Sequence, residues 1–217
     1  MKDLLLGFKL VRFGAKYKMF VVTSIIYFAI GFIFEVGNRG ASSIGYIYLQ
    51  IVSGMLTASA LSIESADFFL ASPKMKKLQT VVPAFMFFVL NTIAFILVVV
   101  VKFMFIEKGL DPVLAARSLI CGSIFLIITL LYYAVSYKLM LVATIVFFAV
   151  AFPAIMILMN SALLDRLGIV FNIGMWPAIG ISYALLIVGV FVYYFMARAL
   201  YKLPFSKYAF RGVLGAK

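Results

Sequence analysis

Apolar residues in this chain form long runs, and charged residues fall only between them. Such runs cover residues 19–34, 41–63, 78–101, 118–164 and 167–197, with Lys138 as a break in the fourth. A helix needs about 20 apolar residues to cross the hydrocarbon core of a bilayer, about 30 Å thick, with every backbone group paired internally. The pattern therefore predicts an all-α integral membrane protein with six transmembrane helices.

Run lengths set the boundaries of the predicted spans. The run 19–34 is short, so Lys18 is expected to extend it by reaching toward the headgroups. The run 118–164 would be about twice the membrane thickness as one helix, so we predict a turn at Tyr137 and Lys138. The last run is too long for one span, and its helix is placed at 176–197. The spans predicted within a single domain of residues 1–217 are about 19–36, 41–63, 78–101, 118–137, 139–160 and 176–197, with an external re-entrant or interfacial segment at 161–175.

The segment 1–18 mixes apolar and basic residues at helical spacing. A helix here would gather apolar residues on one face while Lys2, Lys9 and Lys16 project elsewhere. We therefore predict an N-terminal amphipathic helix that lies in the membrane interface. The alternative is a short extension whose lysines only set the topology. The residues that recur at spacings of three or four are Leu4, Leu5, Phe8, Val11, Arg12 and Lys16.

The distribution of lysine and arginine predicts the orientation. With the N-terminus in the cytoplasm, 14 of the 19 basic residues fall on the cytoplasmic side, which satisfies the positive-inside rule. Both termini are then cytoplasmic, in a plasma membrane. The formal charge of +12 serves orientation and binding to anionic lipid headgroups, and it does not call for nucleic acid. The five remaining basic residues are Arg39, Lys102, Lys108, Arg117 and Arg166, and we place them outside with Glu35, Glu107, Asp111 and Asp165.

The inventory of reactive side chains argues against an enzyme. Hydrophobic residues make up 66% of the chain and charged residues 12%, and histidine is absent. Histidine metal sites, histidine bases and Ser-His or Cys-His nucleophile pairs are thereby excluded. The seven carboxylates all fall outside the centres of the predicted spans, and no phosphate-binding glycine loop is present. We expect no cofactor, no metal and no catalytic residue, no stand-alone ion-coupled carrier, and a buried packing role for Cys121.

A few polar residues lie inside the predicted spans. Asn91 falls near the centre of the third span, where an interhelical hydrogen bond is favoured over a contact with substrate. Asn160, near the outer end of the fifth span, is either interfacial or part of an exit, and Pro153 is expected to kink that span. The second span carries a stripe suited to close helix packing or, alternatively, to lining a pore in a dimer. This stripe consists of Ser53, Gly54, Thr57, Ala58 and Ser62.

The cytoplasmic segment 64–77 joins the second and third spans. It begins as an acidic, aromatic stretch and continues through a turn into a basic helix start, with Ser72 as an N-cap and Pro73 at the first helical position. An ordinary hairpin with positive-inside lysines is the alternative. The residues that carry the pattern are Glu64, Asp67, Phe68, Phe69, Leu70, Ser72, Pro73 and Lys74.

With this segment, the chain resembles the type-2 ABC exporter permeases. In that family an interfacial N-terminal helix precedes six spans, and a Pro-Ser-Arg-Lys-like turn leads into the third span. The matching string here is 67–77, in which Ser-Pro-Lys-Met replaces the usual Leu-Pro-Ser-Arg. Residues 160–176 are similar to the family's short external re-entrant helices.

The resemblance implies that residues 64–72 form a coupling helix, which fits into a cleft on a separate ATPase subunit. Phe68, Phe69 and Leu70 would anchor it, while Glu64 and Asp67 would pair with basic groups. The implied assembly has two ATPase subunits, which bind ATP and Mg²⁺, and a second permease, identical or related. The expected function is export of an amphipathic peptide or lipid-like substrate. A non-transporting membrane interaction or assembly protein remains the alternative.

Overall fold

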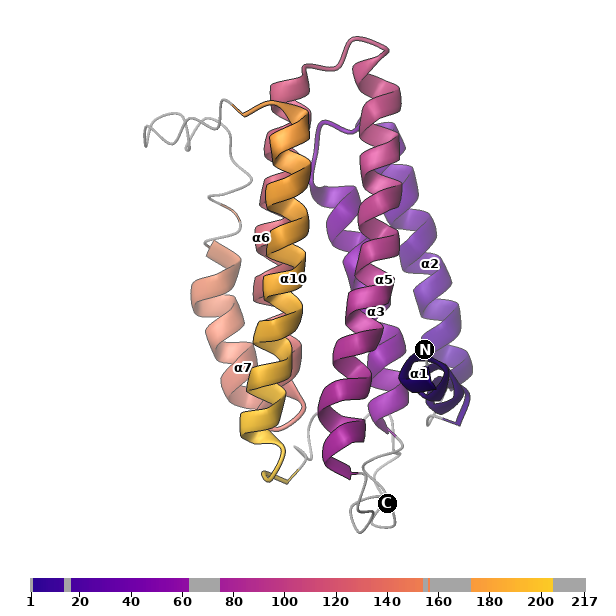
Figure 1. Cartoon of the computed structure of the whole chain (residues 1–217), viewed down its shortest axis with the longest axis vertical. Helices are drawn as coiled ribbons and strands as arrows, with labels where there is room; N and C mark the ends of the chain where they lie inside the picture. Colours follow the sequence, from indigo (N-terminus) through magenta and orange to yellow (C-terminus); the bar gives the residue numbers. More distant parts are fainter. Residues whose placement is uncertain (1, 14–16, 63–74, 154–155, 157–172, 205–217) are drawn as a thin grey trace.

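The structure, a computed structural model, describes residues 2–13, 17–62, 75–153, 156 and 173–204. Throughout these residues the regular elements are helices, and no strand occurs among them. The elements are α1 (Lys2–Phe13), α2 (Tyr17–Gly37), α3 (Ile44–Ser62), α5 (Met75–Ile106), α6 (Pro112–Ser136), α7 (Met140–Val146), the π-helix η2 (Phe147–Ala151) and α10 (Met175–Leu200). The long helices stand side by side in one bundle (Figure 1).

Five helices are long and apolar enough to cross a membrane: α2, α3, α5, α6 and α10. Large apolar side chains also point outward from the bundle, including Ile25 (63% exposed), Ile33 (66%) and Phe195 (61%). An apolar outer surface of this kind suits lipid rather than water. The expectation of an all-α, multi-span membrane protein is confirmed at this level.

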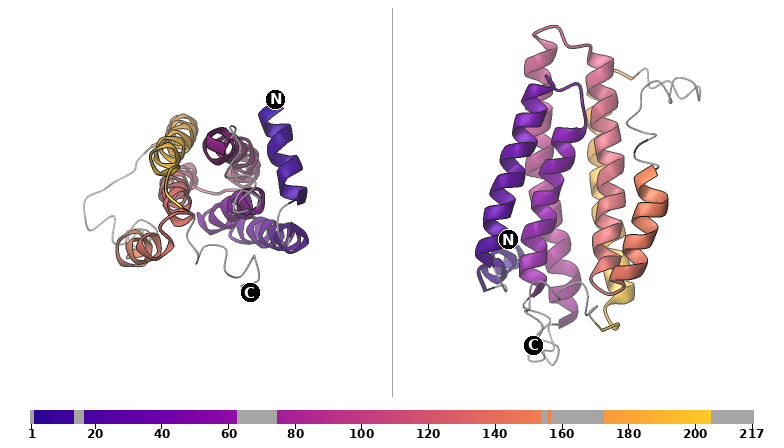
Figure 2. Two further views of the ribbon diagram at one scale, coloured as in Figure 1. Left: turned by 90° about the horizontal axis from the view of Figure 1, so that it is seen from below. Right: turned by 180° about the vertical axis from the view of Figure 1, so that it is seen from behind.

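The helix α1 lies across the bundle instead of along it. The view from below shows α1 from the side, whereas the long helices are seen end-on (Figure 2). Leu10 and Val11 of α1 pack against Ala60 of α3 and against Leu78, Val82 and Met86 of α5. Leu5 and Phe8 instead point away from the bundle.

Two helices extend by five residues or more past a predicted end of their spans. The helix α5 continues to Ile106, past the predicted end at residue 101, and would be about 48 Å long at 1.5 Å per residue. The helix α6 begins at Pro112 and not at residue 118. Asp111 caps it, because its Oδ1 accepts a hydrogen bond of 2.9 Å from the backbone N–H of Val113.

The chain turns between α6 and α7 where the sequence predicts a turn. The α-helix ends at Ser136, Tyr137 and Lys138 form the turn, and α7 begins at Met140. The helix α7 is followed directly by the π-helix η2, in which the backbone N–H of Phe152 donates a hydrogen bond to the carbonyl of Phe147. The π-helix ends two residues before Pro153, whose ring would clash with a carbonyl in a regular helix.

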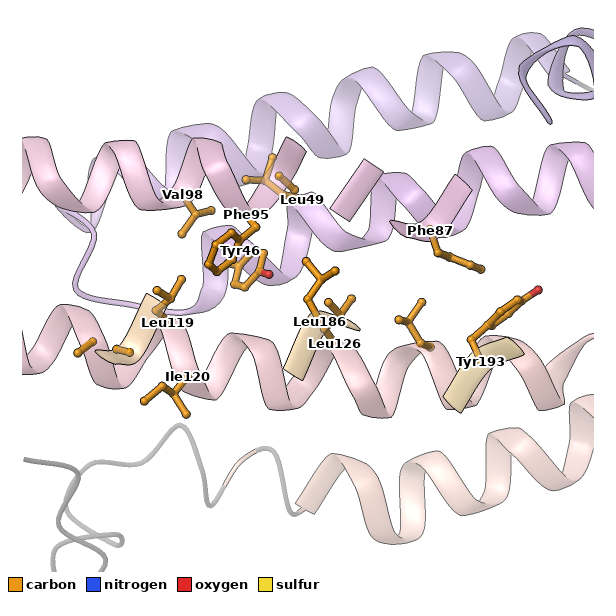
Figure 3. Packing of buried hydrophobic residues seen from close by; sticks show 14 of the residues in the cluster. Tyr46, Leu49, Phe87, Phe95, Val98, Leu119, Ile120, Leu126, Leu186 and Tyr193 are labelled. Carbon is orange, nitrogen blue, oxygen red and sulfur yellow. The ribbon is translucent and has the colours of Figure 1, made fainter. Parts of the chain in front are cut away.

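Helix pairs, rather than one uniform bundle, make up the interior. The helix α2 packs closely on α3, and α6 packs closely on α10, while α5 contacts α3 and α10. Between α2 and α3 the approach requires glycine: a Cβ on Gly45 would lie 2.6 Å from the backbone N of Glu35. The two pairs meet across a core in which Tyr46 and Phe95 lie near Leu119, and Phe87 reaches toward Tyr193 (Figure 3).

Candidate functional site: a polar column between two buried lysines

The residues of the predicted coupling segment lie outside the described residues. These are Glu64, Asp67, Phe68, Phe69, Leu70, Ser72, Pro73 and Lys74, and Asn160 also lies outside them. Of the predicted site residues, the structure brings together Ser53, Thr57 and Asn91. They belong to a larger set of buried polar side chains in the interior of the bundle.

Four polar side chains line one buried face of α3. Tyr46, Gln50, Ser53 and Thr57 recur at spacings of four, three and four, which places them on a single face of the helix. The exposed fraction of each is 3% or less. Together with Asn91 of α5 they form what we call the polar column, which runs along α3 between α5 and α6.

Asn91 makes the interhelical hydrogen bond that the sequence favoured. Its Nδ2 donates to Ser53 Oγ of α3 at 3.0 Å and to the carbonyl of Phe87, one turn earlier in α5, at 2.9 Å. Ser53 Oγ donates in turn to the Gln50 carbonyl at 2.7 Å. Ser53 and Thr57 of the small-residue stripe are thus buried inside the chain's own bundle.

Gln50 connects α3 to α6. Its Nε2 donates to the carbonyl of Gly122 at 2.9 Å. Gly122 also leaves room for the ring of Tyr46, since a Cβ there would lie 2.5 Å from Tyr46 Cδ1. The contact between α3 and α6 thus depends on polar and aromatic side chains placed against a glycine.

One acceptor atom in the polar column lacks a partner. Among the described residues, Asn91 Oδ1 makes no hydrogen bond, although the Asn91 side chain is fully buried, whereas the Tyr46 side chain has Gln50 and Ser123 as hydrogen-bond partners. A buried polar atom without a partner costs about 1–3 kcal/mol. Such atoms are rare in packed interiors and commonly mark a site that binds water or a ligand.

A cluster around Lys102 closes the column at the end that lies uppermost in Figure 1. Lys102 Nζ lies 3.0 Å from Glu35 Oε1 of α2, and both side chains are 0% exposed. The same ammonium group donates to the Gly40 carbonyl at 2.6 Å and to Ser118 Oγ of α6 at 2.7 Å. This upper lysine cluster (Glu35, Gly40, Lys102 and Ser118) therefore joins α2, the loop after it, α5 and α6.

The sequence analysis placed Glu35 and Lys102 in segments between the spans, and the burial of the pair inside the bundle corrects that placement. Both lie within helices, Glu35 in the last turn of α2 and Lys102 about one turn before the end of α5. The sequence contained a signal for this pair. Because successive spans alternate in direction, the ends of the first and third apolar runs lie on the same side of the membrane, and these ends carry Glu35 and Lys102, which have opposite charges. Burial of a lone charge is costly, and pairing reduces that cost.

A polar pocket of about 500 Å³ adjoins the upper lysine cluster. It is formed by the loop between α2 and α3 and the loop between α5 and α6. Arg39 and Ala41 line it and flank Gly40, whose carbonyl Lys102 binds. The other lining residues are Asn38, Phe105, Lys108, Gly109, Leu110 and Asp111.

A layer of aromatic rings lies beside the polar column. Phe87 of α5 stacks on Tyr133 of α6 with ring centroids 5.7 Å apart, and meets the edge of Tyr193 of α10 at 4.7 Å. A Cβ on Gly54 would lie 2.2 Å from Tyr133, so this layer also requires a glycine on α3. The rings therefore flank the polar column where it approaches the lower end of the bundle.

A second lysine closes that lower end. Lys138 Nζ, 9% exposed, donates to Gln79 Oε1 of α5 at 3.1 Å and to the Leu203 carbonyl, just after α10, at 2.9 Å. A cavity of about 10 Å³ beside it, lined by Gln79 and Tyr193, has room for about one water molecule. We call Gln79, Lys138 and the Leu203 carbonyl the lower lysine cluster.

The chemistry that this arrangement offers is hydrogen bonding. Within the described part of the chain, no group of three metal-ligating side chains occurs. The polar column contains amide groups and hydroxyls. The ammonium groups of Lys102 and Lys138 lie toward the two ends of the bundle, each bound by neighbouring oxygen atoms.

Comparison with known protein families, with characterised proteins and with solved structures gives no match for this chain.

Proposed function

We propose that this chain is the transmembrane permease subunit of an ATP-driven exporter of the type-2 ABC kind. The observation that carries the proposal is the position of α1, which packs on α3 through Ala60 and on α5 through Leu78 and Val82. These two helices are joined by residues 63–74, the segment that resembles the family's coupling helix. A partner that moves this segment would act on α1, α3 and α5 together.

The remaining features of the proposal are compatible with that arrangement. The interfacial helix α1 and the end of α10 lie at the same end of the bundle (Figure 1), as the proposal of two cytoplasmic termini requires. The sixth span begins in α7 and η2, whose described part is shorter than a membrane. Two partner ATPase subunits supply ATP hydrolysis, and a second permease, identical or related, completes a plasma-membrane complex that exports an amphipathic peptide or lipid-like substrate.

A pull-down tests the proposal. The tagged chain is co-expressed with its genomic neighbours, extracted in mild detergent, and the eluate is assayed for ATP hydrolysis. We expect a P-loop ATPase in the eluate, lost when Phe68→Glu and Phe69→Glu are introduced together. A matched control, Phe195→Glu in the outward face of α10, probes charge insertion away from the coupling segment. Unchanged recovery of the ATPase with the double variant contradicts the proposal.

A second candidate, a non-transporting membrane interaction protein, is favoured by a different feature. An apolar groove of about 460 Å³ runs between α5 and α10, with Ala84 and Phe88 on one side and Val190 and Phe191 on the other. Such a groove suits a transmembrane helix of a partner protein. This function predicts recovery of the partner without any ATPase, so the same pull-down separates the two candidates.

A further inference from the structure

The polar pocket at the upper end of the bundle is lined by two cations. Arg39, in the loop between α2 and α3, and Lys108, in the loop between α5 and α6, both line it. Among the described residues, neither side chain forms an ion pair with a carboxylate. Asp111 also lines the pocket, but its Oδ1 accepts the N–H of Val113 at the start of α6, where the positive end of the helix dipole offsets its charge. The lining therefore favours an anion.

Arg39 has an unusual backbone conformation. Its φ is 51°, and among the described residues it is the only non-glycine residue with a positive φ. Glycine and asparagine are the residues that adopt this left-handed conformation most readily, and it is common just after the end of a helix. Backbone strain of this kind persists where the surrounding structure fixes it, and it is frequent at ligand sites. An arginine at this position favours a role for its guanidinium group in the pocket.

The pocket is held in shape by the buried interior of the bundle. Lys102 Nζ donates a hydrogen bond of 2.6 Å to the carbonyl of Gly40, the residue that follows Arg39. On the other loop, Lys108 Nζ lies 5.6 Å from the centroid of the Phe105 ring, which also lines the pocket. Both cations are thus positioned before any ligand binds, which lowers the entropic cost of binding.

The pocket lies where the apolar outer surface of the bundle ends. Phe34 of α2 and Met104 of α5 are 41% and 52% exposed, and each precedes a polar lining residue by four positions, which is about one helical turn. Those lining residues, Asn38 and Lys108, belong to the loops at the upper end of the bundle (Figure 1). A change from exposed apolar to polar side chains is typical of the headgroup region of a bilayer.

A lipid phosphate fits the charge, the depth and the walls of this pocket. A guanidinium group binds phosphate through two parallel hydrogen bonds, and an ammonium group binds it as a point charge. The apolar walls formed by Phe105 and Leu110 would contact the glycerol and the first methylene groups of a lipid. A headgroup that carries an amine would bring another cation close to Arg39 and Lys108, so an anionic headgroup without an amine is favoured.

We propose that the upper polar pocket binds the phosphate group of an anionic lipid whose headgroup has no amine. Arg39 and Lys108 bind the phosphate, and the acyl chains lie along the apolar outer surface of the bundle. This lipid site goes beyond the function proposed above and does not depend on an ATPase partner.

Tryptophan quenching by brominated lipids tests the site. The chain has one tryptophan, Trp176, which is 75% exposed at the start of α10 and lies 5.3 Å from Phe103 between ring centroids. The double variant Phe105→Trp with Trp176→Phe moves the tryptophan into the pocket wall. Each protein is reconstituted in phosphatidylcholine vesicles that contain brominated phosphatidylglycerol or brominated phosphatidylcholine, with bromine near the headgroup end of the acyl chains. The ratio of quenching gives the preference for the anionic lipid at each tryptophan.

The proposal predicts a local preference that depends on both cations. A basic residue near the surface favours an anionic lipid by about fivefold, so the Phe105→Trp position should prefer phosphatidylglycerol by at least about tenfold. The native Trp176, at the lipid-facing surface, should show no such preference. Arg39→Asn, which suits the left-handed backbone, and Lys108→Gln should each lower the preference by about fivefold. Lys18→Gln, an exposed cation at the other end of α2, should leave it unchanged.

Three outcomes overturn the proposal. The first is an equal preference at the two tryptophan positions, and the second is a preference that neither Arg39→Asn nor Lys108→Gln lowers. The third is loss of the preference when inorganic phosphate replaces chloride at equal ionic strength, because the pocket would then bind free phosphate and not a lipid. We expect phosphate to leave the preference unchanged.

A second measurement keeps the test decisive if Phe105→Trp fails to fold. The otherwise native chain in a neutral detergent should unfold at a higher temperature with added phosphatidylglycerol than with added phosphatidylcholine, and Arg39→Asn should abolish that difference. Without lipid, Arg39→Asn should be as stable as the native chain or more so, because asparagine relieves the backbone strain. An equal gain from phosphatidylglycerol in both proteins contradicts the site. Neither readout involves an ATPase, so failure here leaves the proposed permease function standing.

Discussion

The two lysines near the ends of α6 are buried in different ways. Lys102 is fully buried and faces a carboxylate, whereas Lys138 is 9% exposed and binds an amide oxygen and a backbone carbonyl. An ammonium group near the surface keeps contact with water or the membrane interface, and a charge pair can be held deeper. The comparison teaches that the upper end contains a fully buried charge pair, whereas the lysine of the lower end is less deeply buried, so the two ends should respond differently to substitution.

The largest effect is expected from Lys102→Met. The substitution leaves Glu35 buried without its counter-charge, and we expect the free energy of unfolding in detergent to fall by about 3–5 kcal/mol. The double variant Glu35→Leu with Lys102→Met removes both charges, and most of the loss should be recovered. If the double variant is as unstable as Lys102→Met alone, the counter-charge does not explain the loss.

The next largest effect is expected where α2 meets α3 beside Glu35. Gly45→Ala places a Cβ 2.6 Å from the Glu35 backbone N, and overpacking of this kind costs about 1–3 kcal/mol. Gly180→Ala is the control, because nothing lies within 4 Å of its added Cβ, and its stability should be unchanged or raised by up to about 1 kcal/mol. Thermal unfolding of both variants measures the difference. Equal behaviour of the two would show that the close approach does not matter.

A smaller loss is expected at the lower end. Lys138→Met removes the hydrogen bonds to Gln79 Oε1 and to the Leu203 carbonyl, each worth about 0.5–1.5 kcal/mol, and Lys138 is less deeply buried than Lys102. The expected loss in unfolding free energy is therefore clearly below that of Lys102→Met. Chemical denaturation of both variants in one detergent gives the ranking, and a reversed order would refute the distinction between the two ends.

The smallest effect concerns the start of α6, which positions Ser118. Asp111→Ala removes the N-cap bond to Val113 and should cost about 1 kcal/mol of unfolding free energy. Asp111→Asn keeps an acceptor at the same place and should retain most of the stability. Denaturation midpoints distinguish the two, and equal losses would indicate that charge rather than capping matters there.

The sequence predicted the features that depend on apolar length and on single polar residues. The turn at Tyr137 and Lys138 and the bond of Asn91 are both present in the structure. It failed for Glu35 and Lys102, because a charge at the end of an apolar run is equally compatible with a loop and with a buried pair. The early start of α6 was missed because the Asp111–Pro112 capping signal lies outside the apolar run. The coupling segment stays a prediction, since residues 63–74 are not described.

The crosswise helix α1 has a consequence for the far end of the molecule. Its outward Leu5 and Phe8 suit insertion into one leaflet, while Leu10 and Val11 are fixed to α3 and α5. The protein is thereby anchored at its lower end, and any difference in bilayer thickness must be taken up at the upper end. A thinner membrane would bring the Glu35–Lys102 pair toward water, and a thicker one would bury it more deeply. The strength of the upper closure would then vary with the lipid composition around it.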